Sequence, residues 1–159
     1  MSLLKLSTLA TELITMLPSE ASHSLALNSL KLIDALGVNL VTKKPLNSYR
    51  CLGIEFKNRL GLAGGLDKNG DYINCLSALG FSFLELGTAT PIPQLGNQKP
   101  RLYRDKPKEA LINNMGFNNK GIDYLIKNIS KANKICPIAV SIGKNSNTPL
   151  DKAIDDYLI

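Results

Sequence analysis

The stretch Leu60-Gly-Leu-Ala-Gly-Gly-Leu-Asp-Lys-Asn-Gly70 decides the fold. It starts as an apolar strand and ends in glycines and charged residues that lead into a helical pattern at residues 70–79. A second strand pattern follows at residues 82–86, and a third at residues 137–142 comes after a helical pattern at residues 120–131. Strands that alternate with helices at these spacings predict an α/β fold with a parallel sheet.

Two short helical patterns precede this α/β part. Leucine and isoleucine recur on one side of residues 3–17 and again of residues 25–36, with Pro18 between them. We expect Ser19 to cap the second helix and Gly37 to end it. Such one-sided helices usually pack on their own domain, and the alternative is a cap that rests on a membrane and admits an apolar ligand.

A long excursion separates the second strand from the next helix, from Thr88 to Phe117. It is too long for an ordinary β–α connection, and it contains two strand-like arms at residues 101–104 and 110–113. A structured loop of this length at the carboxyl end of a strand is where α/β proteins bind ligands. Nearer the N-terminus, residues 51–57 alternate with a period of two and predict one arm of a small hairpin.

Composition excludes several classes of protein. The 19 Lys and Arg against 13 Asp and Glu give a formal charge of +6, but the basic residues are scattered and only 6% of residues are aromatic, so no nucleic-acid partner is expected. The three cysteines are far apart and predict neither a disulfide framework nor a metal site. We expect no signal peptide and no membrane-spanning segment, because no run of about 18 apolar residues occurs.

Glycines or polar residues lie at or near the ends of all three predicted strands. They are Gly64, Gly65 and Lys68 for the first strand, Thr88 for the second and Ser141 for the third. Glycines let the backbone approach a flat ligand closely, and lysine adds a positive charge. The spacing does not match a dinucleotide or nucleoside-triphosphate loop, and a glycine-rich turn with a surface lysine is the simpler alternative. Since strand ends meet at one edge of a parallel sheet, we favour one shared ligand site.

Four asparagines lie within residues 113–119, where the excursion returns. Their amides offer a donor and an acceptor side by side, as needed to bind a pyrimidine ring or a flavin edge. An asparagine-rich turn is the alternative, because asparagine tolerates left-handed backbone.

Several of these segments together resemble the signatures of quinone-dependent (class 2) dihydroorotate dehydrogenases. The segments are Gly61–Gly70, Gly87–Asn97, Lys99–Arg104, Leu111–Asn119 and Ile142–Asn145. The resemblance covers nearly the whole chain, including the N-terminal helix pair. It implies the N-terminal portion of a (β/α)8 TIM barrel at residues 41–159, preceded by a two-helix cap at residues 1–40 that faces the membrane and borders a quinone tunnel.

The resemblance also implies roles for individual residues. The FMN-binding residues would be Gly64, Gly65, Leu66, Asp67, Lys68, Thr88 and Ser141. The substrate pocket would be formed by Lys68, Asn113, Asn114, Met115, Gly116 and Phe117. His23 and Arg104 would line the quinone tunnel. Three positions depart from the family: Ser141 replaces a common asparagine, Asn114 a common arginine, and Gly64 a common alanine.

The activity implied by the resemblance is oxidation of dihydroorotate to orotate in de novo UMP synthesis. FMN would accept the hydride and ubiquinone the electrons, at the inner face of the cytoplasmic membrane or, in a eukaryote, the inner mitochondrial membrane. The family's serine base lies on a later loop, so we expect these 159 residues to be a fragment that is inactive alone. The alternatives are a truncated, non-catalytic product that weakly binds a flavin or an apolar ligand, and an unrelated flavodoxin-like domain.

Overall fold

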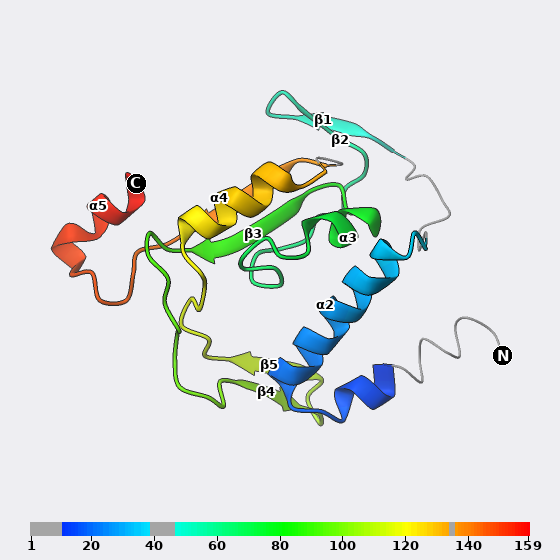
Figure 1. Ribbon diagram of the computed structural model, residues 1–159, viewed down its shortest axis with the longest axis horizontal. Helices are drawn as coiled ribbons and strands as arrows, with labels where there is room; N and C mark the ends of the chain where they lie inside the picture. Colours follow the sequence, from blue (N-terminus) through cyan, green and yellow to red (C-terminus); the bar gives the residue numbers. More distant parts are fainter. Residues whose placement is uncertain (1–10, 39–46, 134–135) are drawn as a thin grey trace.

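The computed structural model describes residues 11–38, 47–133 and 136–159 (Figure 1). Residues 11–15 are helical and are followed, in chain order, by α2 (Ser19–Ala35), β1 (Tyr49–Cys51), β2 (Ile54–Phe56), α3 (Ile73–Ala78), β3 (Leu84–Ala89), β4 (Leu102–Asp105), β5 (Ala110–Asn113), α4 (Ile122–Lys131), β6 (Ile138–Ile142), the 3-10 helix η1 (Leu150–Lys152) and α5 (Ala153–Tyr157). Most of the first predicted helix lies outside the described residues, so the two-helix cap remains a prediction.

Helix α2 begins and ends with different devices. The expected Ser19 cap is wrong: Pro18 is the N-cap residue, and no side chain caps the helix. Ser19 is already helical, and the Pro18 carbonyl accepts the N–H of Ser22. The expected end is confirmed, because Gly37 has φ +71° and both Gly37 and Val38 donate to carbonyls of the last turn. This is the Schellman arrangement, which needs a left-handed residue at Gly37.

The hairpin near residue 50 is displaced from the prediction. Residues 51–57 hold the turn and the second strand, whereas the first strand, β1, starts at Tyr49 and pairs antiparallel with β2. Leu52 and Gly53 form the turn with φ values of +49° and +78°. Two consecutive positive φ values match the right-handed twist of a tight hairpin. The alternating pattern of residues 51–57 runs across this turn, and periodicity alone does not reveal it.

The parallel sheet is confirmed at its second and third strands. β3 and β6 pair in parallel, and α4 lies between them in the chain, which makes a βαβ unit. The first predicted strand is reduced to an isolated bridge between Leu62 and Leu84, although Gly65 still donates its N–H to the carbonyl of Gly87. Glycines have low strand propensity, which accounts for this irregular segment.

The core lies between this sheet and its helices. Leu76 on α3, Leu84 and Leu86 on β3, and Leu125 on α4 are each no more than 1% exposed and belong to one cluster. Replacing one of these leucines with alanine should cost about 2–5 kcal/mol of stability. The core therefore fixes where β3 ends and where the α3 and α4 N-termini lie.

The excursion folds as predicted from its two arms. β4 and β5 pair antiparallel, with Leu102 opposite Asn113, and α2 contacts both β4 and α3. Figure 1 shows α2 crossing from this hairpin to α3, so the helix packs against both. After β6 the chain forms η1 and α5, which follow Pro149. In the described residues no helix is long and apolar enough to cross a bilayer.

Candidate functional site

A cavity of about 1020 Å³ opens at the carboxyl ends of the parallel segments. Six parts of the chain line it: α2, residues 62–72, β3, Lys99 with Leu102 at the start of β4, the end of β5 with the segment that follows it, and β6. The predicted site residues among its lining are His23, Gly64, Gly65, Leu66, Asp67, Lys68, Thr88, Asn113, Met115, Gly116, Phe117 and Ser141. The structure therefore brings the three strand ends and the asparagine-rich segment to one cavity.

The turn that carries Lys68 presents backbone and one cationic group to this cavity. Gly65 has φ +98°, and a Cβ placed there would meet no atom within 4 Å, so the space beside it is open. The Lys68 ammonium donates to the carbonyl of Gly65 at 2.6 Å. Burial and the nearby charge of Arg101 lower the pKa of Lys68. A positive group with few protein partners next to open glycine backbone suits an anionic, flat ligand.

Asp67 has a structural task within the same turn. Its side chain is 2% exposed, and its two oxygens accept the N–H groups of Asp71 and Tyr72 at 2.9 Å each. These bonds hold the backbone of residues 71 and 72 in a turn ahead of α3, and the helix begins at Ile73 rather than at the predicted Gly70. Burial raises the pKa of the Asp67 carboxyl. Asp67 borders the cavity, but its carboxylate is engaged by the protein itself.

The ends of β3 and β6 place two hydroxyls side by side. The oxygens of Thr88 and Ser141 are 3.0 Å apart and share a hydrogen bond. Gly143 allows this approach, because a Cβ there would lie 2.9 Å from the Thr88 methyl group. The pair can donate one hydroxyl hydrogen to a ligand while the other links the two strands.

The asparagines after β5 divide into different roles that the sequence did not separate. Asn119 is buried and bonds Thr90, Gly121 and Phe117, so it holds the loop. Asn114 does not line the cavity, and its side-chain oxygen accepts from Asn97. Asn113 lines the cavity, as predicted.

Asn118 also lines the cavity and was not predicted as a site residue. Its side-chain oxygen is buried and has no hydrogen-bond partner. An unsatisfied buried acceptor costs about 1–3 kcal/mol of stability, so Asn118 is held here by the fold of the loop at a cost. Its place in the asparagine-rich segment was the signal available in the sequence.

The two predicted quinone residues lie in different settings. His23 projects from α2 into the lining of the cavity, where burial and the neighbouring charge of Lys68 lower its pKa. Arg104 is not among the lining residues and donates to the carbonyls of Thr15 and Leu17, at 3.1 and 2.8 Å. It therefore ties β4 to the end of the N-terminal helical residues.

A second link between α2 and the excursion was not predicted. Arg101 is 7% exposed and donates twice to Glu20 Oε1, at 3.1 and 3.0 Å. It also donates to the carbonyls of Leu95 and Asn97. Since 81 positions separate the two residues, the local sequence pattern could not predict this pair. In the described ranges no cluster of three His, Cys, Asp or Glu residues could hold a metal ion.

A cavity at the carboxyl ends of parallel strands, partly covered by a helix, defines an α/β ligand-binding protein. Residues 47–159 match the family model described as dihydroorotate dehydrogenase. The chain belongs to the dihydroorotate dehydrogenase family. This membership excludes the alternative of an unrelated flavodoxin-like domain.

Curated relatives and a solved structure agree with the family. The dihydroorotate dehydrogenase (quinone) of Acinetobacter baylyi is 48% identical over 154 residues, which are 97% of this chain and 46% of the relative. The enzyme of the same name from Hamiltonella defensa is 51% identical over 145 residues, covering 90% of this chain and 43% of the relative. The chain thus spans about half the length of these relatives.

The crystal structure of the Eimeria tenella enzyme in complex with ferulenol has a TM-score of 0.69 and 35% identity. The match covers 84% of this chain and 38% of that one. Over most of this chain, the fold is therefore that of the corresponding part of a dihydroorotate dehydrogenase.

Proposed function

We propose that the protein oxidises dihydroorotate to orotate in UMP synthesis, with FMN as hydride acceptor and ubiquinone as final electron acceptor. The observation that carries this proposal is the single cavity where Lys68, open glycine backbone and Asn113 meet. The names of the relatives support the reaction and the quinone. The described α/β part would be the start of a TIM barrel, with α2 and the preceding helical residues as its cap.

The residues present fit FMN. The glycine backbone of the Gly64–Gly65 turn would lie against the flat ring, and Lys68 would provide positive charge beside it. The Thr88 and Ser141 hydroxyls would offer further hydrogen bonds. When bound, FMN would supply the hydride-accepting chemistry.

The chain's own residues would bind and orient the substrate. Lys68 would attract the carboxylate of dihydroorotate, and the Asn113 amide would hydrogen-bond the pyrimidine ring. Met115 and Phe117, together with the glycine between them, would form an apolar wall that keeps water away. Gly64 leaves room for Glu85, whose carboxylate oxygen would lie 2.8 Å from a Cβ at that position.

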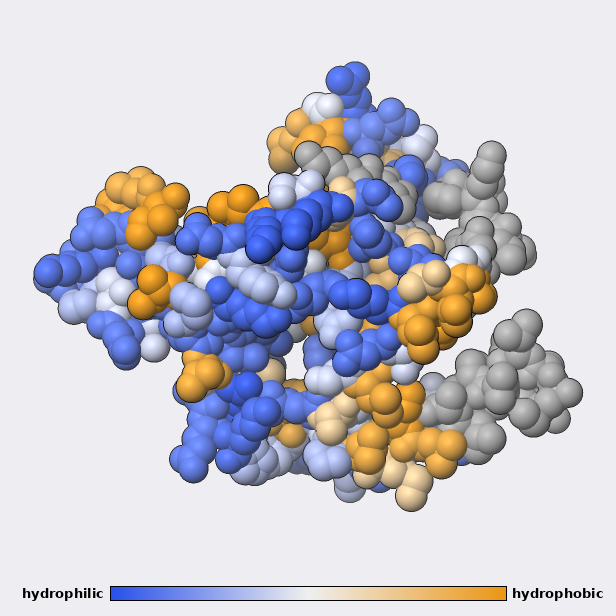
Figure 2. Space-filling view, viewed as in Figure 1, coloured by the Kyte–Doolittle hydropathy of each residue, from blue (hydrophilic) through white to orange (hydrophobic). Residues whose placement is uncertain are grey.

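The quinone would enter beside α2. His23 lines the cavity from this helix, and Arg104 holds the adjoining residues 15–17 in place. Exposed apolar side chains gather on the same helical region, as Figure 2 shows; they include Leu13, Met16, Leu17, Leu25, Leu32 and Leu36. This surface supports peripheral binding to the inner face of the cytoplasmic membrane, or to the inner mitochondrial membrane in a eukaryote.

A second candidate concerns residues 1–159 on their own, since these residues match only 46% and 43% of the length of two curated relatives. By themselves these residues would then bind a flavin or an apolar ligand weakly without oxidising the substrate.

The test is turnover by the intact natural polypeptide, compared with residues 1–159 alone. We expect the intact protein to hold FMN and to reduce ubiquinone when dihydroorotate is added. We expect residues 1–159 to show no turnover. Absence of turnover and of bound FMN in the intact protein would refute the proposed function, and turnover by residues 1–159 would refute the second candidate.

Quinone assignment has its own control. His23→Ala should lower the rate with ubiquinone more than the rate with a small soluble electron acceptor. Equal losses with both acceptors would contradict a role for His23 at the quinone.

A further inference from the structure

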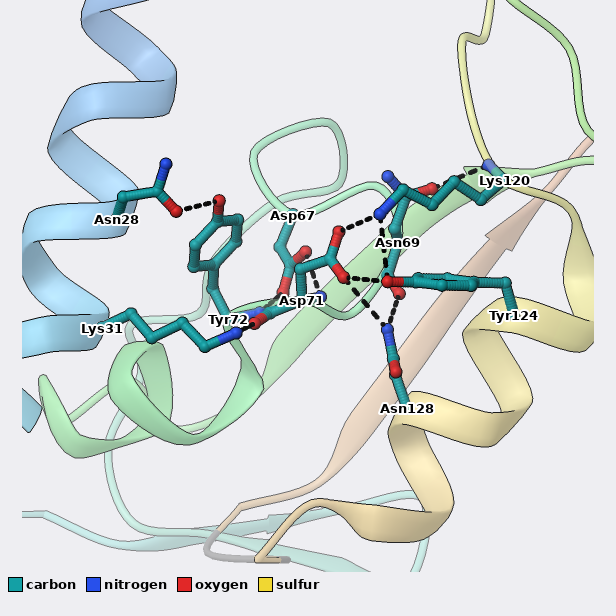
Figure 3. A network of polar contacts seen from close by, with 9 residues as sticks. All are labelled: Asn28, Lys31, Asp67, Asn69, Asp71, Tyr72, Lys120, Tyr124 and Asn128. Carbon is teal, nitrogen blue, oxygen red and sulfur yellow. Dashed lines mark hydrogen bonds and ion pairs between the residues drawn. The ribbon is translucent and has the colours of Figure 1, made fainter. Parts of the chain in front are cut away.

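The turn that carries Lys68 is held from behind by a network of polar side chains (Figure 3). Its centre is Asp71, which lies three residues after Lys68. Figure 3 shows Asp71 between side chains that come from α2 on one side and from α4 on the other. The turn is therefore fixed to two helices that are distant from it in sequence.

The α4 side supplies three donors to the Asp71 carboxylate. Tyr124 donates its hydroxyl at 2.6 Å and Asn128 its amide at 3.3 Å, both to Oδ1, while the Lys120 ammonium donates to Oδ2 at 3.2 Å. Tyr124 and Asn128 are four residues apart, so they share one face of α4. Lys120 precedes the helix by two residues and also packs over the Tyr124 ring. Both carboxylate oxygens are thus satisfied.

Lys120 and Asn128 also form hydrogen bonds with Asn69 in the turn. The Asn69 side-chain oxygen accepts the backbone N–H of Lys120 at 2.9 Å, and its carbonyl accepts the Asn128 amide at 2.9 Å. Lys68 is bonded to Gly65 on the cavity side. Lys68 therefore borders the cavity next to two anchored residues, Asn69 and Asp71, which border it as well.

The α2 side completes the support. Lys31 donates to the Asp71 carbonyl at 3.0 Å, and the Tyr72 hydroxyl donates to Asn28 at 2.9 Å. Lys31 also lies over the Tyr72 ring, 5.5 Å from its centre. Helix α2 contributes His23 to the cavity, so one helix both lines the site and supports the turn.

We propose that Asp71 is a positioning residue for Lys68, acting through the turn that it ties to α4. The donors from Tyr124, Asn128 and Lys120 hold the turn at a fixed depth, so that the Lys68 ammonium stays at the wall of the cavity. As far as the reaction is concerned this inference rests on the proposed function, whereas the positioning itself does not. The carboxylate is required because a single group must accept donors on both oxygens.

The first test measures backbone hydrogen exchange by mass spectrometry in the intact protein. Asp71→Asn keeps the size of the side chain but replaces one acceptor oxygen with a donor facing Tyr124 or Lys120. We expect exchange at residues 64–72 to rise about tenfold, with residues 84–89 of β3 unchanged. Asp123→Asn is the matched control, since it removes an exposed charge from α4 outside the network; it should change neither segment.

Tyr124→Phe provides a milder variant that keeps the ring and removes one donor. It should raise exchange at residues 64–72 by about two- to fivefold, so the proposal is still tested if Asp71→Asn does not fold. Unchanged exchange at residues 64–72 in Tyr124→Phe would overturn the proposal. So would an equal rise at residues 84–89, because the network would then support the fold in general.

The second test is a double-mutant cycle on the rate of flavin reduction by dihydroorotate. Asp71→Asn should slow reduction about tenfold when Lys68 is present and by less than about twofold in a Lys68→Met background. Equal factors in both backgrounds would overturn positioning of Lys68. If dihydroorotate does not reduce the wild-type flavin, the proposed function fails, and hydrogen exchange alone decides the positioning.

Discussion

The two walls of the cavity are built in opposite ways. The turn at residues 64–72 is held from behind by side chains of α2 and α4, and its Asp67 is almost fully buried. The β4–β5 hairpin and the segment after it are held by strand pairing and by Asn97, Arg101 and Arg104, while all four residues of β5 are exposed. A wall fixed from behind leaves its ligand-facing groups few ways to move, whereas a hairpin wall depends on a few attachments.

The fixed wall should carry the larger chemical effect. Lys68→Ala should slow flavin reduction by dihydroorotate by about 10²- to 10³-fold, because the positive charge at the glycine turn is lost. Rapid mixing without oxygen measures this rate. Lys127→Ala, which removes an exposed lysine from α4, should leave the rate unchanged. A near-normal rate in Lys68→Ala would remove Lys68 from its assigned role.

The hairpin wall should be more sensitive to loss of its attachment. Arg101→Ala strands a partly buried Glu20 and two carbonyls, and we expect it to lower the free energy of unfolding by about 3 kcal/mol. Urea unfolding measures the change. Lys99 also pairs with Glu20, at 3.6 Å, but its side chain is 68% exposed, so Lys99→Ala should cost less than about 0.5 kcal/mol. Equal costs would mean that burial of Arg101 is unimportant.

A smaller effect is expected where the two strand ends meet. Ser141→Asn introduces the amide that the family resemblance leads us to expect at this position, and it should tighten FMN binding by about two- to tenfold through one added hydrogen bond. Titration of the apoprotein with FMN measures the affinity, and Ser141→Ala is the control that removes the hydroxyl shared with Thr88. Unchanged affinity in Ser141→Asn would indicate that the hydroxyl pair already makes this contact.

The smallest effect concerns pH. The pKa of His23 is lowered by burial and by Lys68, so the unfolded chain takes up a proton more readily than the folded protein. Above about pH 6.5 both forms are neutral and stability is unaffected; below it His23 reduces stability as pH falls. Because the group is only half buried, the loss should be on the order of a few tenths of a kcal/mol.

His23→Gln should remove that loss between about pH 7 and 5, measured by urea unfolding at each pH. Wild type and His23→Gln share every other titratable group, so the difference between their pH profiles isolates His23. Identical pH profiles of wild type and His23→Gln would show that His23 is not held in its uncharged form.

Local pattern predicted most of the fold. The order of strands and helices, the β4–β5 hairpin and the convergence of strand ends followed from periodicity and spacing. Local pattern could not show that the strand at residues 60–65 shrinks to one bridge, because its glycines satisfy an apolar pattern without favouring a strand. It also could not find the turn at Leu52 and Gly53 inside an alternating run.

The candidate site was predictable only where its residues lie close together in the sequence. The Lys68 turn and Asn113 were recognised because their segments are distinctive. The supporting pairs were missed because they join distant residues: 53 positions separate Asp71 from Tyr124, and 81 separate Glu20 from Arg101. Likewise, Asn118 and Asn119 are adjacent and chemically identical, and only the folded loop turns one toward the cavity and the other into the protein.

The most direct test of the central claim is to add dihydroorotate, without oxygen, to the intact protein while its flavin absorbance is followed. If one cavity joins FMN and substrate against the Lys68 turn, the absorbance should bleach and then recover when ubiquinone is added. A bound flavin that stays oxidised in the presence of dihydroorotate would contradict the assignment of this cavity.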